Sequence, residues 1–294
     1  MRVGGFKLRS LARAVWLACL AAVAAVPAMA PVEAALAQAV TIPNYWDTGE
    51  RLPKPDLSAL QRLRFLTTTD FPPFNFIDRQ KRLTGFHVDL ARAICAELDI
   101  LPKCQIQALP WAELETAMAR GDGEAIIAGL EVNARTRDQY AFSRPYLRIP
   151  ARFVARRENG FTEPMSEVVL RHRVGLVAGS QHLSWFDTAF TRARREVFPT
   201  RAAALQALQD GQVDLVFSDA VSLSFWLMSD AAKDCCAFAG GPYLSTVEFG
   251  YGLAIAFARG RPELAAAADY ALKEINDRGV FAELYLRYFP LGLY

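Results

Sequence analysis

Two hydrophobic patterns alternate along residues 61–290. Short apolar runs predict strands, as at Leu63–Thr68 and Val213–Phe217. Apolar side chains that recur at every third or fourth position predict helices, as at Gly85–Leu98. Because strands and helices take turns, we expect an α/β protein with mostly parallel sheets.

Further elements continue the alternation, and two stretches interrupt it. Residues 40–60 are rich in proline and have little periodicity, which predicts an extended N-terminal arm. Residues 231–242 are expected to form a loop. The remaining helices are expected at Trp111–Arg120, Ala202–Leu208, Ala220–Met228, Pro262–Ile275 and Val280–Phe289, and the remaining strands at Ala125–Leu130, Ala151–Arg156, Val174–Val177 and Leu253–Phe257.

The first 39 residues have the three-part layout of a secretory signal peptide. Residues 1–13 carry four basic side chains and no acidic one, and residues 14–26 are an unbroken apolar run. Such a run is too short to cross a bilayer, which takes about 20 residues. We therefore expect residues 1–39 to be cleaved off and the remainder to be exported.

Without this segment the charge balance changes sign. The chain has 33 Lys and Arg and 31 Asp and Glu, of which residues 1–39 hold four and one, so 29 bases and 30 acids remain. The net charge of the exported part is therefore −1. This balance gives no support for a nucleic-acid partner.

Four cysteines remain after residue 39, and an oxidising compartment favours their pairing. Cys95 lies near the end of a predicted helix and Cys104 follows a short turn, so a disulfide between them is sterically reasonable. Cys235 and Cys236 are adjacent, and a vicinal disulfide, two thiols or bonds to other partners all remain open. The three histidines are scattered and no CxxC occurs, so no metal site and no cofactor are expected.

Several segments, in one order along residues 61–290, resemble bacterial extracellular solute-binding proteins of family 3. These are the amino-acid-binding subunits of ABC importers, and a Gly-Phe-x-Val-Asp-Leu helix start is part of their pattern. The matching segments are Leu63–Phe74, Leu83–Leu90, Trp111–Leu114, Ala125–Leu130, Ala141–Tyr146, Val174–Ser180, Gly211–Asp219 and Leu253–Phe289.

The resemblance implies a type II periplasmic-binding-protein fold with two lobes and a ligand cleft between them. Lobe 1 would combine residues 61–149 with residues 244–294, and lobe 2 would comprise residues 150–243. We accordingly expect a monomeric periplasmic protein, not an enzyme. It would capture an amino acid or a related small polar solute and deliver it to the membrane permease of an ABC importer.

Five further positions are expected to contact the ligand, and three of them, Phe71, Trp111 and Asp219, match cleft positions of the family. Phe71 and Trp111 stand where the resemblance implies aromatic rings over the ligand, although Trp111 is equally compatible with the core of its helix. Asp219 stands where an acid pairs with the ligand's ammonium group, and it is also a suitable cap for the helix at residue 220. Ser180 and Gln181 lie at a strand-to-helix turn, whose backbone N–H groups suit an anion.

The carboxylate-binding stretch departs from the family pattern. The family has small-Ile-Thr-x-x-Arg, whereas this chain places Glu131 at the small residue, Asn133 at the threonine and Thr136 at the arginine. Arg135 and Arg137 flank that last position, and we expect Arg137 to reach the cleft because a one-residue shift is easy in a loop. Glu131 would repel a ligand carboxylate if it pointed inward.

Two alternatives follow from these residues. One is a larger anionic or aromatic solute, such as a polycarboxylate or a quinone cofactor. It would be held by an arginine cluster at the cleft edge beside Phe71 and Trp111, made of Arg135, Arg137, Arg144 and Arg148. The other is an exported dehydratase that uses Glu131 and Asp219 as an acid–base pair.

Overall fold

The computed structural model describes Met1, residues 41–232 and residues 234–294. The predicted signal peptide at 1–39 therefore lies outside the described residues, apart from Met1. Residues 41–60 contain no helix or strand, and Ile42, Trp46 and Leu57 pack against the hydrophobic core of the first sheet. Among the described residues, no helix combines the length and the apolar character needed to cross a membrane.

The first sheet has the strand order β5-β1-β6-β13-β7. Its first three strands are parallel, and β13 runs antiparallel to β6 and β7. A small three-stranded sheet, β2-β3-β4, lies between β1 and the first helix in the chain. The bounds are β1 Leu63–Thr67, β2 Asp70–Phe71, β3 Asn75–Ile77, β4 Leu83–Thr84, β5 Cys104–Ala108, β6 Ala125–Ile126, β7 Tyr140–Phe142 and β13 Ala256–Ala258.

Helices cover both faces of this sheet because consecutive strand residues point to opposite sides. Phe65 packs in the cluster with α1, α8 and α9, whereas its neighbour Leu66 packs in the cluster with α2. The alternation continues in β6, where Ala125 faces the first cluster and Ile126 the second. The helices are α1 Phe86–Glu97, η1 Leu101–Lys103, η2 Trp111–Glu113, α2 Leu114–Ala119, α3 Ala134–Gln139, α8 Pro262–Asp277 and α9 Val280–Tyr288.

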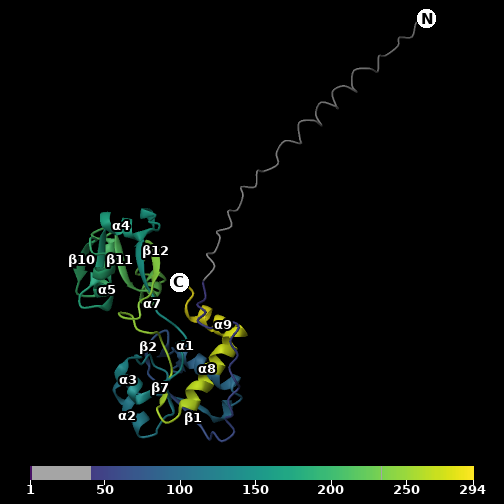
Figure 1. The fold of residues 1–294 in the computed structure, drawn as a ribbon. Helices are drawn as coiled ribbons and strands as arrows, with labels where there is room; N and C mark the ends of the chain where they lie inside the picture. Colours follow the sequence, from purple (N-terminus) through teal and green to yellow (C-terminus); the bar gives the residue numbers. More distant parts are fainter. Residues whose placement is uncertain (2–40, 233) are drawn as a thin grey trace. The chain divides into compact units, whose positions relative to one another are not determined.

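The second sheet has the order β10-β9-β11-β8-β12, with β10, β9 and β11 parallel (Figure 1). Phe153 and Val154 on β8 belong to the clusters on opposite faces, with α4 and α5 on one side and α6 and α7 on the other. The elements are β8 Ala151–Arg156, η3 Arg157–Asn159, α4 Met165–Arg171, β9 Arg173–Val177, α5 Gln181–Ala189, β10 Arg194–Phe198, α6 Arg201–Gln209, β11 Leu215–Asp219, α7 Ala220–Leu227 and β12 Cys236–Tyr243.

Two chain segments connect the sheets: residues 143–150 before β8 and residues 244–255 after β12. They are hydrogen-bonded to each other, since the Leu253 N–H donates to the Leu147 carbonyl at 2.7 Å and the Tyr146 N–H donates to the Leu253 carbonyl at 2.9 Å. Leu147 and Leu253 form an isolated antiparallel bridge. The two connections therefore run side by side.

The loop predicted at 231–242 was wrong for its second half, which forms β12. Gly240, Gly241 and Pro242 are typical of turns, but here they lie in an edge strand that pairs only with β8. The pairing shifts register between Phe238 and Gly240 and again before Tyr243, and such irregular edge strands tolerate proline. The strand predicted at 125–130 is shorter than expected, because only Ala125 and Ile126 pair with neighbouring strands.

Both cysteine pairs are disulfides. Cys95 is bonded to Cys104, with Cα atoms 6.4 Å apart, which joins the end of α1 to the start of β5 as predicted. Cys235 is bonded to Cys236, so of the three open possibilities the structure has the vicinal disulfide. This second pair lies at the start of β12, beside the cluster that contains Trp226 and Leu227.

Candidate functional site

Phe71 lies at the end of β2, next to the loop that follows β6. Its ring stacks on the buried ring of Phe74, with centroids 4.7 Å apart. Gly129 faces the same ring, since a Cβ on Gly129 would lie 3.0 Å from Cε1 of Phe71. Gly129 also has φ +84°, a conformation that glycine adopts readily. The Phe71 ring is therefore held in place from two sides while remaining partly exposed.

Trp111 is exposed rather than part of the helix core. It begins η2 just after β5, and 50% of its surface is accessible. With Leu130 it lines a cavity of about 190 Å³. β1, β5 and β6 are parallel, so their carboxyl ends meet at one sheet edge, and Phe71, Trp111 and Gly129 all follow those ends.

The stretch with Glu131 and Asn133 leads into a helix rather than a loop. The Asn133 side chain accepts a hydrogen bond from the Thr136 N–H at 3.0 Å, and the Thr136 hydroxyl interacts with the Asn133 N–H at the same distance, which is a capping box. Thr136 is completely buried. Asn133 and Thr136 therefore start α3, and Glu131 is left exposed just before it.

The four arginines do not form one cluster beside Phe71 and Trp111, so that prediction was wrong. Arg135 forms an exposed ion pair with Glu115 at 3.3 Å. The other three line a separate cavity, discussed below, whose lining residues include neither aromatic ring. The expectation that Arg137 lies in a loop was also wrong, because it belongs to α3, and a helix fixes the direction of each side chain. The three arginines of the cavity are Arg137, Arg144 and Arg148.

In the second sheet, Ser180 and Gln181 begin α5. Ser180 is the N-cap, and its hydroxyl accepts a hydrogen bond from the Leu183 N–H at 3.1 Å. Gln181 is the first helical residue and is exposed. The first N–H groups of a helix have no partner within the helix, so this turn presents free donors.

Asp219 has two close partners at the end of β11, and the Ser218 hydroxyl lies farther away at 3.5 Å. One carboxylate oxygen accepts from the Ser222 N–H at 2.7 Å, which caps α7, and the other accepts from Arg201 at 2.6 Å. The Asp219 side chain is 24% exposed and that of Arg201 is 43% exposed. His182 lies close to both: burial lowers its pKa, the charge of Asp219 raises it and that of Arg201 lowers it. A carboxylate, a guanidinium and an imidazole thus meet at one place.

The sequence analysis missed Arg201 because it missed β10, and it set His182 aside as one of three scattered histidines. β9, β10 and β11 are parallel, and their carboxyl ends lead to Ser180, Arg201 and Asp219 respectively. The common sheet edge brings the three residues together, although more than 15 positions separate each from the next along the chain. Residues 194–198 (Arg-Arg-Glu-Val-Phe) lack the polar–apolar alternation of a typical strand, so the local sequence gave little signal for β10.

Phe249, which the sequence analysis also missed, connects the two groups of residues. Its ring stacks on His182, with centroids 5.0 Å apart, and it belongs to the connection after β12. With Glu131 it lines a cavity of about 140 Å³, together with Tyr251 and Ile149. Phe249 therefore lies beside Glu131 from the first sheet's edge and beside His182 from the second sheet's edge.

A buried polar chain lies beneath the Phe71 loop. The Asn75 side chain donates to the Thr68 hydroxyl at 2.7 Å, so its oxygen is left to accept from Nδ1 of His87, also at 2.7 Å. Nε2 of His87 is then the acceptor for the Tyr146 hydroxyl at 2.8 Å. Burial lowers the pKa of His87 to about 3, so the imidazole is neutral, with its proton on Nδ1.

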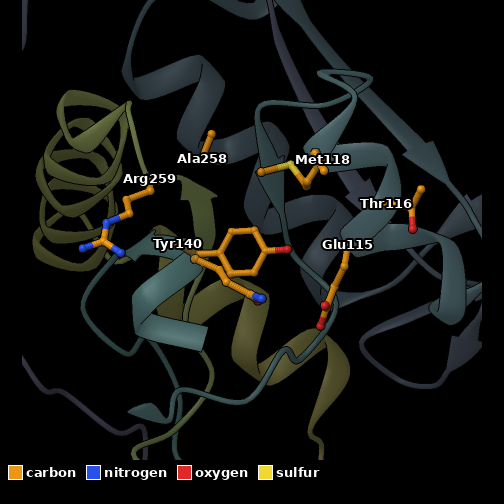
Figure 2. Close-up of a pocket in the computed structure, with 8 residues that line it drawn as sticks. Glu115, Thr116, Met118, Tyr140, Ala258 and Arg259 are labelled. Atoms are coloured by element: carbon orange, nitrogen blue, oxygen red, sulfur yellow. The ribbon is translucent and has the colours of Figure 1, made fainter. Parts of the chain in front are cut away.

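A larger cavity lies elsewhere on the first sheet, and its polar groups do not converge. It measures about 620 Å³ between α2 and the start of β7 (Figure 2). The Tyr140 hydroxyl points toward the side of Glu115, but Arg259 points away from it (Figure 2). Glu115 is also paired with Arg135, and Arg259 donates to the Asp138 carbonyl. The residues around Phe249 are therefore the better candidate site.

Comparison with known proteins agrees with this architecture. The family described as bacterial extracellular solute-binding proteins, family 3, matches residues 63–291. The L-arginine-binding protein of Pseudomonas aeruginosa is 26% identical over 243 residues, which covers 82% of this chain and 92% of that protein. Among solved structures, an ancestral cationic amino acid solute-binding protein superposes with a TM-score of 0.61 at 22% identity, covering 79% of this chain and 97% of the other.

An ancestral cyclohexadienyl dehydratase has the same fold, with a TM-score of 0.62 at 21% identity, covering 80% of this chain and 95% of the other. The fold is that of the type II periplasmic-binding proteins. Since the family match covers most of its length, the chain belongs to the bacterial extracellular solute-binding proteins, family 3.

Proposed function

We propose that this protein captures a cationic amino acid in the periplasm and delivers it to the membrane permease of an ABC importer. The observation that carries the proposal is the partly exposed carboxylate of Asp219, fixed at the end of a parallel strand beside His182 and Arg201. A carboxylate in such a position forms strong, charge-assisted hydrogen bonds to an ammonium group. The arginine-binding relative supports a cationic ligand.

The aromatic residues suit the aliphatic or guanidinium part of such a ligand. Phe71 is fixed by Phe74 and Gly129, and Trp111 is half exposed at the same sheet edge. A cation over an aromatic face gains about 0.5–2 kcal/mol, depending on how far it is desolvated. Glu131, exposed just before α3, adds a second negative charge near this edge.

The α-carboxylate of the ligand needs a different partner from the one implied by the family pattern. Thr136 occupies the arginine position and is buried in the capping box of α3, so it contributes no charge. Arg201 is the alternative, because its guanidinium is 43% exposed and already lies against Asp219. The N-terminus of α5, with Ser180 and Gln181, supplies backbone donors for the same carboxylate.

The remaining features of the proposal concern organisation and processing. Residues 61–149 and 244–294 form lobe 1, residues 150–243 form lobe 2, and the ligand is held between them. Residues 1–39 direct export and are removed. The exported protein acts as a monomer and has no catalytic activity, so incubation with prephenate or arogenate should leave either compound unchanged.

A calorimetric titration tests the ligand class. The full-length chain is expressed, and the exported product is titrated in phosphate-free buffer with arginine, lysine, ornithine, glutamine and aspartate. We expect saturable binding of at least one cationic amino acid and none of aspartate. Ligand at 100 times its Kd should stabilise the protein by about 2.7 kcal/mol in a thermal-shift assay. Absence of binding by every cationic amino acid would refute the proposal.

Asp219→Asn tests the site itself, because asparagine retains the helix cap but lacks the charge. We expect at least a tenfold loss of affinity with little change in Tm. Asp122→Asn is the matched control, since Asp122 is exposed and pairs with Arg120 at the far end of α2. Equal affinities of the two variants would show that Asp219 only caps α7.

A further inference from the structure

Three arginines line a further cavity on the first sheet, which shares Tyr251 with the small cavity beside Phe249 and Tyr140 with the large cavity of Figure 2. The cavity measures about 530 Å³, within the usual range for small-molecule sites. Arg137 comes from α3, whereas Arg144 and Arg148 come from the connection before β8. Tyr251, from the connection after β12, and Asp269, from α8, complete the polar lining.

Only one of the three arginines has its charge balanced. Arg144 forms two hydrogen bonds to the carboxylate of Glu50 in the N-terminal arm, at 2.6 and 2.7 Å. Asp269 accepts from the backbone N–H of Arg144 at 2.7 Å and lies 3.9 Å from Nε of its guanidinium, and burial raises the pKa of this carboxyl to about 6. Glu50 in the arm and Asp269 in α8 thus balance the charge of Arg144.

Arg137 and Arg148 have aromatic neighbours instead of carboxylates. Arg137 lies over the Tyr251 ring at 5.4 Å, and Arg148 lies over the Tyr45 ring at 5.4 Å. Within residues 41–232 and 234–294, neither arginine forms an ion pair, and Nε of Arg148 is buried without a hydrogen-bond acceptor. Three guanidinium groups against two carboxylates leave the cavity with a net positive charge.

We propose that this cavity is a binding site for a small oxyanion, a carboxylate or a phosphate, held by Arg137 and Arg148 rather than by the Asp219 and Arg201 pair proposed for the transported solute. A guanidinium presents planar, paired N–H donors that match the oxygens of carboxylate and phosphate groups. An oxyanion between Arg137 and Arg148 balances the residual charge and gives both side chains acceptors that the protein does not supply. Tyr251 and Tyr45 hold the two guanidinium groups by their faces, which leaves their edges for the anion.

The charge balance also predicts the role of the arm. Glu50 competes with an anion for Arg144, because its carboxylate occupies the donors of that side chain. Removal of the Glu50 charge should therefore strengthen anion binding. Removal of Arg137 or Arg148 should weaken it.

Nuclear magnetic resonance of the arginine Nε–H groups tests the site. The uniformly ¹⁵N-labelled exported protein is titrated with inorganic phosphate and, separately, with succinate at constant ionic strength. We expect the Arg137 and Arg148 signals to shift to a plateau with at least one of the two anions. The anion that reaches the plateau at lower concentration identifies whether phosphate or carboxylate is the better ligand.

Substitutions give the expected ranking. Arg137→Gln and Arg148→Gln should each lower the affinity at least tenfold, and Glu50→Gln should raise it at least threefold. Arg120→Gln is the matched control, because Arg120 is exposed and pairs with Asp122 away from this cavity. Thermal unfolding without anion identifies any variant that does not fold. If Arg148→Gln does not fold, the opposite effects of Arg137→Gln and Glu50→Gln on anion affinity still test the proposal.

Shifts that grow without a plateau in all exposed arginines would overturn the proposal, because they would indicate ionic screening only. Equal affinities in Arg137→Gln and Arg120→Gln would do the same. The result is independent of the transported solute, since Asp219→Asn should lose the cationic amino acid and keep the oxyanion.

Discussion

His87 makes the stability of this protein depend on pH in a way that one substitution removes. The side chain is completely buried, and burial lowers its pKa from the ordinary value of 6.5 to about 3. Because the folded pKa lies below the unfolded one, the stabilisation is complete above pH 6.5 and is lost as the pH falls toward 3. In that range the unfolded chain takes up a proton at this histidine that the folded protein does not.

The magnitude follows from the two pKa values. Each pH unit between them costs about 1.4 kcal/mol of folding free energy. From pH 7.0 to pH 4.5 the loss attributable to His87 is about 2.5 kcal/mol. His87→Gln lacks this titration, although it should cost about 1–3 kcal/mol at pH 7 because Asn75 and Tyr146 lose well-placed hydrogen-bond partners.

Urea unfolding at pH 7.0 and pH 4.5, followed by circular dichroism, measures the effect. The buried and paired carboxylates are common to both proteins, so their contributions cancel when the two pH dependences are subtracted. We expect the wild type to lose about 2.5 kcal/mol more than His87→Gln. His172→Gln is the matched control, since the His172 side chain is 37% exposed, and it should behave like the wild type. Parallel losses in the wild type and His87→Gln, within about 0.5 kcal/mol, would refute the reasoning.

Three further substitutions test the fold around the site. Replacement of Cys95 and Cys104 by serine should cost about 2.5 kcal/mol in urea unfolding, because the disulfide closes a short loop between cysteines nine positions apart; a loss below about 1 kcal/mol would contradict this. Gly129→Ala should cost about 1–2 kcal/mol and weaken binding of the proposed cationic amino acid, since φ is +84° and the new Cβ displaces the Phe71 ring; unchanged calorimetry would be the contrary result. Asn133→Ala should cost about 1 kcal/mol through the lost cap of α3, and Asn133→Ser should restore it.

The strongly periodic elements were predictable because their buried positions are apolar and recur with the period of a helix or a strand. The apolar repeat of Gly85–Leu98 predicted α1, and the apolar run of Leu63–Thr68 predicted β1, each to within about two residues. β12 was not predictable, because its glycines and proline have no strand propensity of their own. It is a strand only because β8 offers a free edge with which it pairs.

Some residues of the candidate site were predictable from the sequence, and others required the tertiary structure. Residue types placed Phe71, Trp111 and Asp219 at the ends of elements, which needs only local sequence, and the near-neutral charge of residues 40–294 followed from composition. Their neighbours required the tertiary structure: Arg201 meets Asp219 only because β10 and β11 lie in one parallel sheet. The direction of each side chain is fixed by the helix or strand that carries it. For this reason Arg135 pairs with Glu115 while Arg137, two positions later in α3, lines the cavity that also contains Arg144 and Arg148.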